Sequence, residues 1–183
     1  MKRRGWLPAP ALALALLPAL PLALLAGCDR GEPAPPAPAA AEPMTVTSTA
    51  FPEGGTIPAE FTCSGAGHRP PLTWTGGEGA RAYAIVVVDP DAPSGNYYHW
   101  VVLDLPTGTT SVVGALPEGA HELKNTSGKK GWTPPCPPSG THHYHFTVYA
   151  LNKMVNASSL EGAFTTIEKS TIAQGTLTGL VSH

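Results

Sequence analysis

The chain has 183 residues, of which 42% are apolar and 13% are charged, and its formal net charge is −2. Without the basic residues at positions 2–4 the rest of the chain carries a net charge of −5 and contains no cluster of Lys or Arg. This pattern argues against nucleic acid as a partner.

The first 28 residues have the organisation of an export signal. A basic start at residues 2–4 is followed by an apolar run over residues 6–26, and small residues precede Cys28. The tetrapeptide Leu25-Ala26-Gly27-Cys28 resembles the lipobox of bacterial lipoproteins, in which the cysteine is acylated after cleavage. We therefore predict a signal peptide at residues 1–27 and lipidation of Cys28. The domain is then expected in the cell envelope, anchored outside the cytoplasm on the periplasmic side or the outer cell surface.

An uncleaved membrane-spanning helix is the alternative for this segment, because about 20 apolar residues can cross a bilayer. Prolines at positions 8, 10, 18 and 21 argue against it, since proline disrupts a long regular helix. Both alternatives keep the domain outside the cytoplasm.

Residues 29–43 contain no large apolar side chain and are rich in Pro and Ala. Such a composition favours an extended, semi-rigid spacer. We predict that residues 28–43 form a lipidated cysteine with a disordered linker, and that residues 44–183 form one folded domain.

The domain sequence favours short strands, because turn residues recur between apolar runs. Residues 83–88 are a continuous apolar run, as expected for a strand buried on both faces. Residues 99–105, 144–151 and 177–181 are predicted as further strands, and residues 164–174 as a helix that Gly175 ends. We expect a mostly β protein: an antiparallel β-sandwich with a small C-terminal helix.

Acidic side chains and a histidine meet at one predicted sheet edge. Asp89 follows strand 83–88, Asp91 lies two residues further on, and His99 opens the next strand. Because consecutive strands joined by a loop of moderate length are usually antiparallel neighbours, we expect Asp89, and Asp91 with it, to lie close to His99.

A second group of polar residues lies at the start of strand 144–151. Side chains alternate across a strand, so His142 and Tyr144 share one face, while His143 and His145 share the other. If His142 meets His99, the site holds two imidazoles, carboxylates and a phenol. Imidazolium groups held by carboxylates donate hydrogen bonds, so the site suits a small oxyanion.

Several blocks of the domain carry a resemblance to a known family. They are Ile57-Pro58, Phe61-Thr62-Cys63, Pro70-Pro71-Leu72-Thr73-Trp74, Asp89-Pro90-Asp91-Ala92-Pro93, His99-Trp100-Val101-Val102, Leu116-Pro117-Glu118-Gly119 and the run from Pro135 to Tyr144. Together they resemble the phosphatidylethanolamine-binding protein family, in its bacterial Raf-kinase-inhibitor-like branch, over about residues 44 to 181.

The resemblance implies a β-sandwich with a small pocket for phosphate-like groups, and it implies no cofactor. We therefore expect non-catalytic binding of a phosphate-bearing small molecule, a lipid head group or a phosphorylated peptide. The family's ligand-binding positions fall on Asp89, Asp91, Pro93, His99, Cys136, Pro137, His142 and Tyr144.

Two further predictions concern the cysteines and metal binding. Cys63 and Cys136 either form a disulfide in an oxidising compartment or remain separate buried thiols. We expect no metal site, because strand alternation separates His142 from His143 and His145, whereas a structural zinc site needs four converging ligands.

Two other functions stay open as alternatives. A hydrolase could use Cys136 with His142, or Asp89 with His99, but the sequence contains no Gly-x-Ser-x-Gly or comparable motif. A protein inhibitor of a kinase or peptidase is the other alternative, since the resemblance implies this role for some members of the family.

Overall fold

The structure, a computed structural model, describes residues 42–183. The predicted signal peptide 1–27 and the lipidated Cys28 lie outside the described residues, as does most of the predicted linker 28–43. No helix within residues 42–183 combines the length and the apolar character that crossing a membrane would require.

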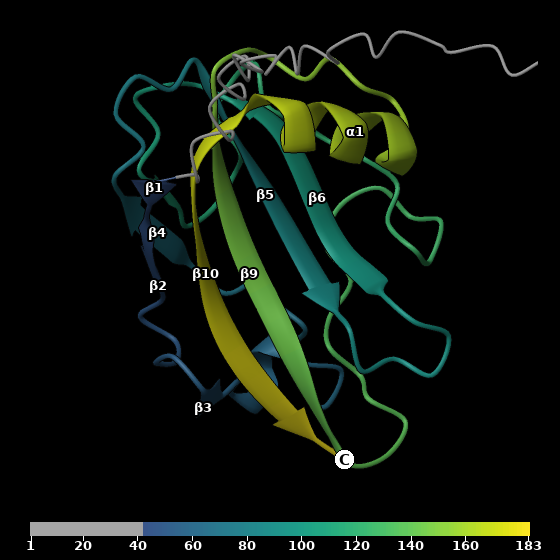
Figure 1. Ribbon diagram of the computed structural model, residues 1–183. Coiled ribbons are helices and arrows are strands. Elements are labelled where there is room, and N and C mark those ends of the chain that lie inside the picture. The colour runs from purple at the N-terminus through teal and green to yellow at the C-terminus, as the bar shows by residue number, and fades with distance from the viewer. Residues whose placement is uncertain (1–41) are drawn as a thin grey trace, which may run out of the picture. The chain divides into compact units, whose positions relative to one another are not determined.

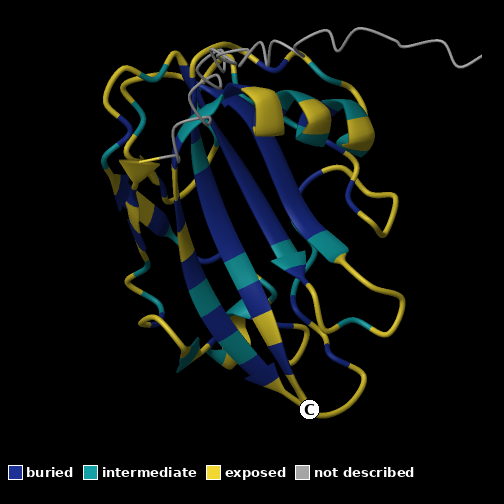
Figure 2. Ribbon diagram, viewed as in Figure 1, coloured by how far each residue is buried: buried dark blue, intermediate teal, exposed yellow. Residues whose placement is uncertain are grey.

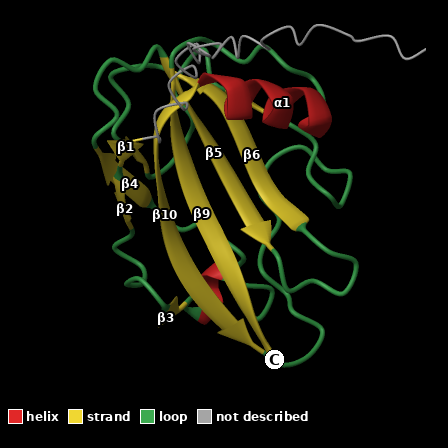
Figure 3. Ribbon diagram, in the orientation of Figure 1, coloured by secondary structure: helices red, strands yellow, loops and turns green. Residues whose placement is uncertain are grey.

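The described chain folds into two β-sheets, one α-helix and a short 3-10 helix (Figure 1, Figure 3). The expectation of a mostly β protein with a C-terminal helix is confirmed. In chain order the elements are β1 (Glu42–Pro43), β2 (Thr45–Thr47), β3 (Gly55–Thr56), η1 (Ala59–Phe61), β4 (Leu72–Thr75), β5 (Ala82–Asp89), β6 (Tyr97–Leu105), β7 (Ser111–Val112), β8 (His121–Glu122), β9 (Thr141–Leu151), α1 (Leu160–Ser170) and β10 (Thr171–Ser182).

The larger sheet has the order β1-β10-β9-β5-β6-β8, and β3 also pairs with β10. Its four long strands are antiparallel to one another, whereas the two-residue strands β1 and β3 run parallel to β10. The sheet is therefore mixed at that edge, where a purely antiparallel arrangement was expected. The smaller sheet has the antiparallel order β2-β4-β7.

Both faces of the larger sheet are covered, which explains the continuous apolar run of β5. Ile85 and Val87 pack in one core cluster with Trp74 of the smaller sheet. Val86 packs in a second cluster with Ile167 of α1. Figure 2 shows that β5 and β6 are buried over most of their length. The prediction of a strand buried on both faces is thus confirmed.

The C-terminal helix begins and ends earlier than residues 164–174 predicted. The Ser159 side chain accepts a hydrogen bond from the Gly162 amide and caps the first turn, so the helix spans Leu160–Ser170. Gly175 does not end the helix but lies within β10. A side chain there would collide with the backbone carbonyl of Met44, so this glycine permits the close approach of the two segments.

A disulfide joins Cys63, just after η1, to Cys136 in the long loop before β9. The Cys63 amide also donates to the carbonyl of Pro135 at 3.0 Å. Two segments that are 73 residues apart in the sequence are thereby fixed to each other. This cross-link holds a loop that has little regular secondary structure.

Replacing Cys63 and Cys136 together by Ser should lower the free energy of unfolding by about 4 kcal/mol, because the unfolded chain regains the freedom of a 73-residue loop. Urea unfolding followed by tryptophan fluorescence measures the change. Reductant provides the control: it should destabilise the native chain by a similar amount and leave the double variant unchanged. Equal responses of both proteins to reductant would contradict the prediction.

Candidate functional site

A pocket opens at the end of the larger sheet where β5 ends and where β6 and β9 begin. The helix α1 lies at the opposite end of these strands (Figure 1). The pocket volume of about 260 Å³ lies below the roughly 300–1,000 Å³ of sites for drug-sized ligands, so it suits a small group. The lining residues are Asp89, Ala92, Pro93, Ser94, Tyr97, His99, Thr133, Pro134, Cys136, Pro138, His142 and Tyr144.

Most of the site residues predicted from the sequence line this pocket, but Asp91 and Pro137 do not. Asp91 is exposed and contacts His143 on the outer face of β9. In an extended segment side chains at i and i+2 face the same way. Cys136 and Pro138 therefore both face the pocket, and Pro137 between them is buried away from it.

His99 reaches the pocket through a β-bulge in β6. Tyr98 opposes Val88 of β5, whereas Trp100 opposes Val87, so His99 is the extra residue between them. Tyr98 packs against the cluster beside α1, and Trp100 packs in the core between the sheets. Because a bulge interrupts strict alternation, His99 and Trp100 can share the inner face.

The imidazole of His99 is 4% exposed and is held by its surroundings. Its Nδ1 lies 2.8 Å from the carbonyl oxygen of Thr133. A carbonyl can only accept, so Nδ1 carries the proton and Nε2 is the nitrogen left to face a ligand. Burial lowers the pKa of His99, while the Thr133 carbonyl and the charge of Asp89 oppose this shift. Nε2 is therefore an acceptor at neutral pH.

Asp89 and His142 form a buried pair between β5 and β9. The Nδ1 of His142 lies 2.7 Å from Asp89 Oδ2, and their side chains are 8% and 5% exposed. The other carboxylate oxygen accepts the amide N–H of Asp91 at 2.8 Å. Each oxygen thus has a donor, which offsets the cost of burying the charge. The Nε2 of His142 remains for a ligand.

Tyr144 is completely buried, and its hydroxyl has no hydrogen-bond partner among the described residues. Burial raises the pKa of Tyr144, and the nearby Asp89 charge adds to this shift, so the hydroxyl stays protonated. An unsatisfied buried polar group costs about 1–3 kcal/mol. A ligand oxygen that accepted from this hydroxyl would remove that cost.

Sequence reasoning missed the residues that support His99 from behind. The buried side-chain amide of Asn125 donates to the Gly131 carbonyl at 2.9 Å and to the Thr133 hydroxyl at 2.8 Å, and it approaches the His99 carbonyl at 3.3 Å. Thr133 in turn orients the His99 ring. Loop residues such as these follow no periodic pattern, whereas Tyr97 could have been found from its place two residues before His99 on the same strand.

The catalytic pairings considered from the sequence are not formed. Cys136 has no free thiol, because it is bonded to Cys63. Asp89 bonds to His142 and not to His99. Within residues 42–183 no group of three or more His, Cys, Asp or Glu side chains is placed to hold a metal ion. What remains is a set of hydrogen-bonding groups around a small cavity.

Comparison with known proteins agrees with the blocks found in the sequence. The family model described as phosphatidylethanolamine-binding protein matches residues 47–182. LppC of Mycobacterium tuberculosis, whose name proposes it to be a lipoprotein, is 47% identical over 126 residues, which cover 67% of this chain and 61% of that relative. A UPF0098 protein of Mycobacterium bovis is 42% identical over 169 residues, which cover 82% of this chain and 83% of that relative.

Two solved structures share the fold. A phosphatidylethanolamine-binding protein homologue from Chlamydia trachomatis is 30% identical with a TM-score of 0.72, and the match covers 78% of this chain and 99% of that one. Escherichia coli YbcL, described as a new member of the mammalian PEBP family, is 29% identical with a TM-score of 0.71. The match covers 76% of this chain and 98% of YbcL.

Replacing Tyr144 by Phe removes the unpartnered hydroxyl and keeps the ring. We expect the free energy of unfolding to stay unchanged or to rise by up to about 1 kcal/mol, because an unsatisfied buried group is lost. Tyr83→Phe is the matched control, since the Tyr83 hydroxyl donates to the Gly77 carbonyl at 3.4 Å and its loss should lower stability. Urea unfolding measures the free energy of unfolding of both variants. If Tyr144→Phe loses more stability than the control, the Tyr144 hydroxyl is hydrogen-bonded within the protein and the prediction is wrong.

Proposed function

Because the chain belongs to the phosphatidylethanolamine-binding protein family, we propose that it binds a phosphate-bearing small molecule, lipid head group or phosphorylated peptide without catalysis. The phosphate group occupies the pocket between His99, His142 and Tyr144. No cofactor takes part in this function.

The observation that carries the proposal is the convergence of polar atoms without partners on one small cavity. In the described part of the chain, the Tyr144 hydroxyl has no partner, and neither His99 nor His142 uses its Nε2 in a hydrogen bond. Phosphate oxygens can accept from the hydroxyl and from protonated imidazoles. Pro93 and Pro138 stiffen the rim, so little side-chain freedom is lost on binding.

The charges of the pocket link anion binding to protonation. Its lining contains no Lys or Arg. Asp89 is the acidic residue of the lining and is paired with His142, and burial keeps His99 neutral at ordinary pH by lowering its pKa. An anion therefore favours the binding of a proton to His99, because the imidazolium supplies the positive charge that the free pocket lacks.

The name of the relative LppC supports a location in the cell envelope. We propose that Cys28 carries the lipid and holds the domain outside the cytoplasm, at the periplasmic side or the outer cell surface. The described chain begins at β1, which pairs with the start of β10 at the α1 end, whereas the pocket lies at the other end (Figure 1).

Titration calorimetry of the purified full chain with phosphate, phosphoethanolamine and O-phosphoserine tests the function. We expect the native chain to bind at least one of them, and His99→Ala to weaken that binding about tenfold or more, because a hydrogen bond to a charged group is lost. His68→Ala is the control, since His68 is an exposed histidine outside the pocket lining. No binding by the native chain would favour the alternative of a kinase or peptidase inhibitor.

The pH dependence gives a separate prediction. Sulfate carries no proton, so its charge must be balanced by the protein. Because burial lowers the pKa of His99, the ring is neutral at about pH 8 and gains a proton only toward lower pH. Sulfate affinity should rise as the pH falls from about 8 to about 6, with net proton uptake seen as a dependence of the binding heat on the buffer. An equally steep rise in His99→Ala would assign the proton to another group.

A further inference from the structure

We propose that His143, which faces away from the pocket, is a positioning residue for it: through Asp91 it fixes loop 90–96, which forms one wall. This inference rests on the proposed function, because it concerns the affinity of the same pocket. It assigns a role to a histidine that touches no ligand.

Two consecutive residues of β9 bind two acidic residues at the β5 end. His142 faces inward and bonds to Asp89, whereas His143 faces outward, with its side chain 52% exposed. The side chains of Asp89 and Asp91 are thus held by opposite faces of one strand. The start of loop 90–96 is therefore bonded to β9 on both faces of the strand, through Asp89 on the inner face and Asp91 on the outer face.

Two groups of His143 donate hydrogen bonds to the same carboxylate oxygen of Asp91. The backbone N–H of His143 donates to Asp91 Oδ2 at 2.8 Å, and its Nδ1 donates to the same oxygen at 2.7 Å. The amide of Asp91 is occupied as well, since it donates to Asp89 Oδ1 at 2.8 Å. These hydrogen bonds lower the pKa of Asp91, so the carboxylate remains charged and the contact charge-assisted.

The wall depends on such polar contacts because it is not packed in the core. Ala92, Pro93 and Ser94 line the pocket, yet Pro93 and Ser94 are exposed. A turn closed by the Gly95 amide and the Ala92 carbonyl, 2.9 Å apart, connects them to β6. If His143 releases Asp91, the ring of Pro93 loses its fixed place in the pocket wall, and the pocket loses preorganisation.

The test compares three variants of the full chain by amide hydrogen exchange without ligand and by calorimetry with inorganic phosphate. In His143→Ala we expect exchange of the Asp91 and Gly95 amides to become about two- to fivefold faster and phosphate affinity about two- to fivefold weaker, as fits the loss of one exposed charge-assisted bond. His143→Asn keeps a donor near the position of Nδ1 and should restore both quantities.

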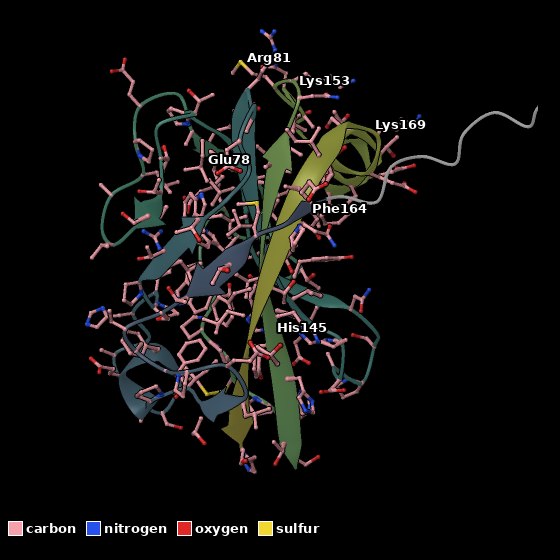
Figure 4. The ribbon with its side chains drawn as sticks, turned by 60° about the vertical axis from the view of Figure 1, so that its left-hand side comes forward. Glu78, Arg81, His145, Lys153, Phe164 and Lys169 are labelled. Atoms are coloured by element: carbon pink, nitrogen blue, oxygen red, sulfur yellow. A yellow bond between two sulfur atoms is a disulfide. The ribbon has the colours of Figure 1, made fainter. Side chains whose placement is uncertain are left out.

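His145→Ala is the matched control. His145 lies two residues further along β9 (Figure 4), on the same outer face, but its Nδ1 lies 3.2 Å from the Thr178 hydroxyl and makes no bond to the loop. His145→Ala should change neither the exchange of the Asp91 and Gly95 amides nor the affinity for phosphate. Unchanged exchange in His143→Ala would overturn the proposal, and so would faster exchange with unchanged affinity.

The two measurements separate a failure of the proposed function from a failure of the proposed role of His143. A native chain that binds no phosphate would refute the phosphate pocket and with it any effect of His143 on affinity. The exchange arm needs no ligand, so it still decides whether His143 fixes the loop.

Discussion

A carboxylate buried at the end of a strand has to be paired, and the pairing of Asp89 organises one end of this protein. One oxygen accepts from His142 at the start of β9, and the other accepts from the backbone of Asp91 at the start of loop 90–96. A strand end, a loop and a neighbouring strand are thus fixed by one side chain. The pocket lies where these three segments meet, which is why its inner wall is rigid although half of its rim is loop.

Polar contacts also hold the segments that lie behind the pocket. Glu122 accepts the indole N–H of Trp100 at 2.6 Å, and the guanidinium of Arg69 lies 4.3 Å from the centre of the same ring. Asn125 donates to Gly131 and Thr133 within the loop between β8 and β9. These contacts tie Arg69, strand β8 and the loop that follows β8 to each other and to β6.

The sequence predicts the parts of this arrangement that follow from periodicity. The buried run of β5, and the alternation that separates His142 from His143, are read directly from residue types. The bulge at His99 cannot be read this way, because it depends on how two strands pair and not on the residues of one. Pro138 and not Pro137 lines the pocket because Pro138 faces the same way as Cys136, and residue types alone do not tell which way Cys136 faces. The signal peptide and lipidated cysteine stay predictions.

The neutral state of His99 in the free pocket bears on which anion fits it. With its Nδ1 proton committed to the Thr133 carbonyl, neutral His99 presents Nε2 as an acceptor, while the Tyr144 hydroxyl presents a donor. A singly ionised phosphate ester has both kinds of group, so its P–OH can donate to His99 while another oxygen accepts from Tyr144. A carboxylate or a sulfate can only accept, and must first draw a proton onto a buried ring whose pKa is lowered by burial. In the proposed site the cost of charging His99 is therefore a basis for selecting phosphate over other anions of similar size.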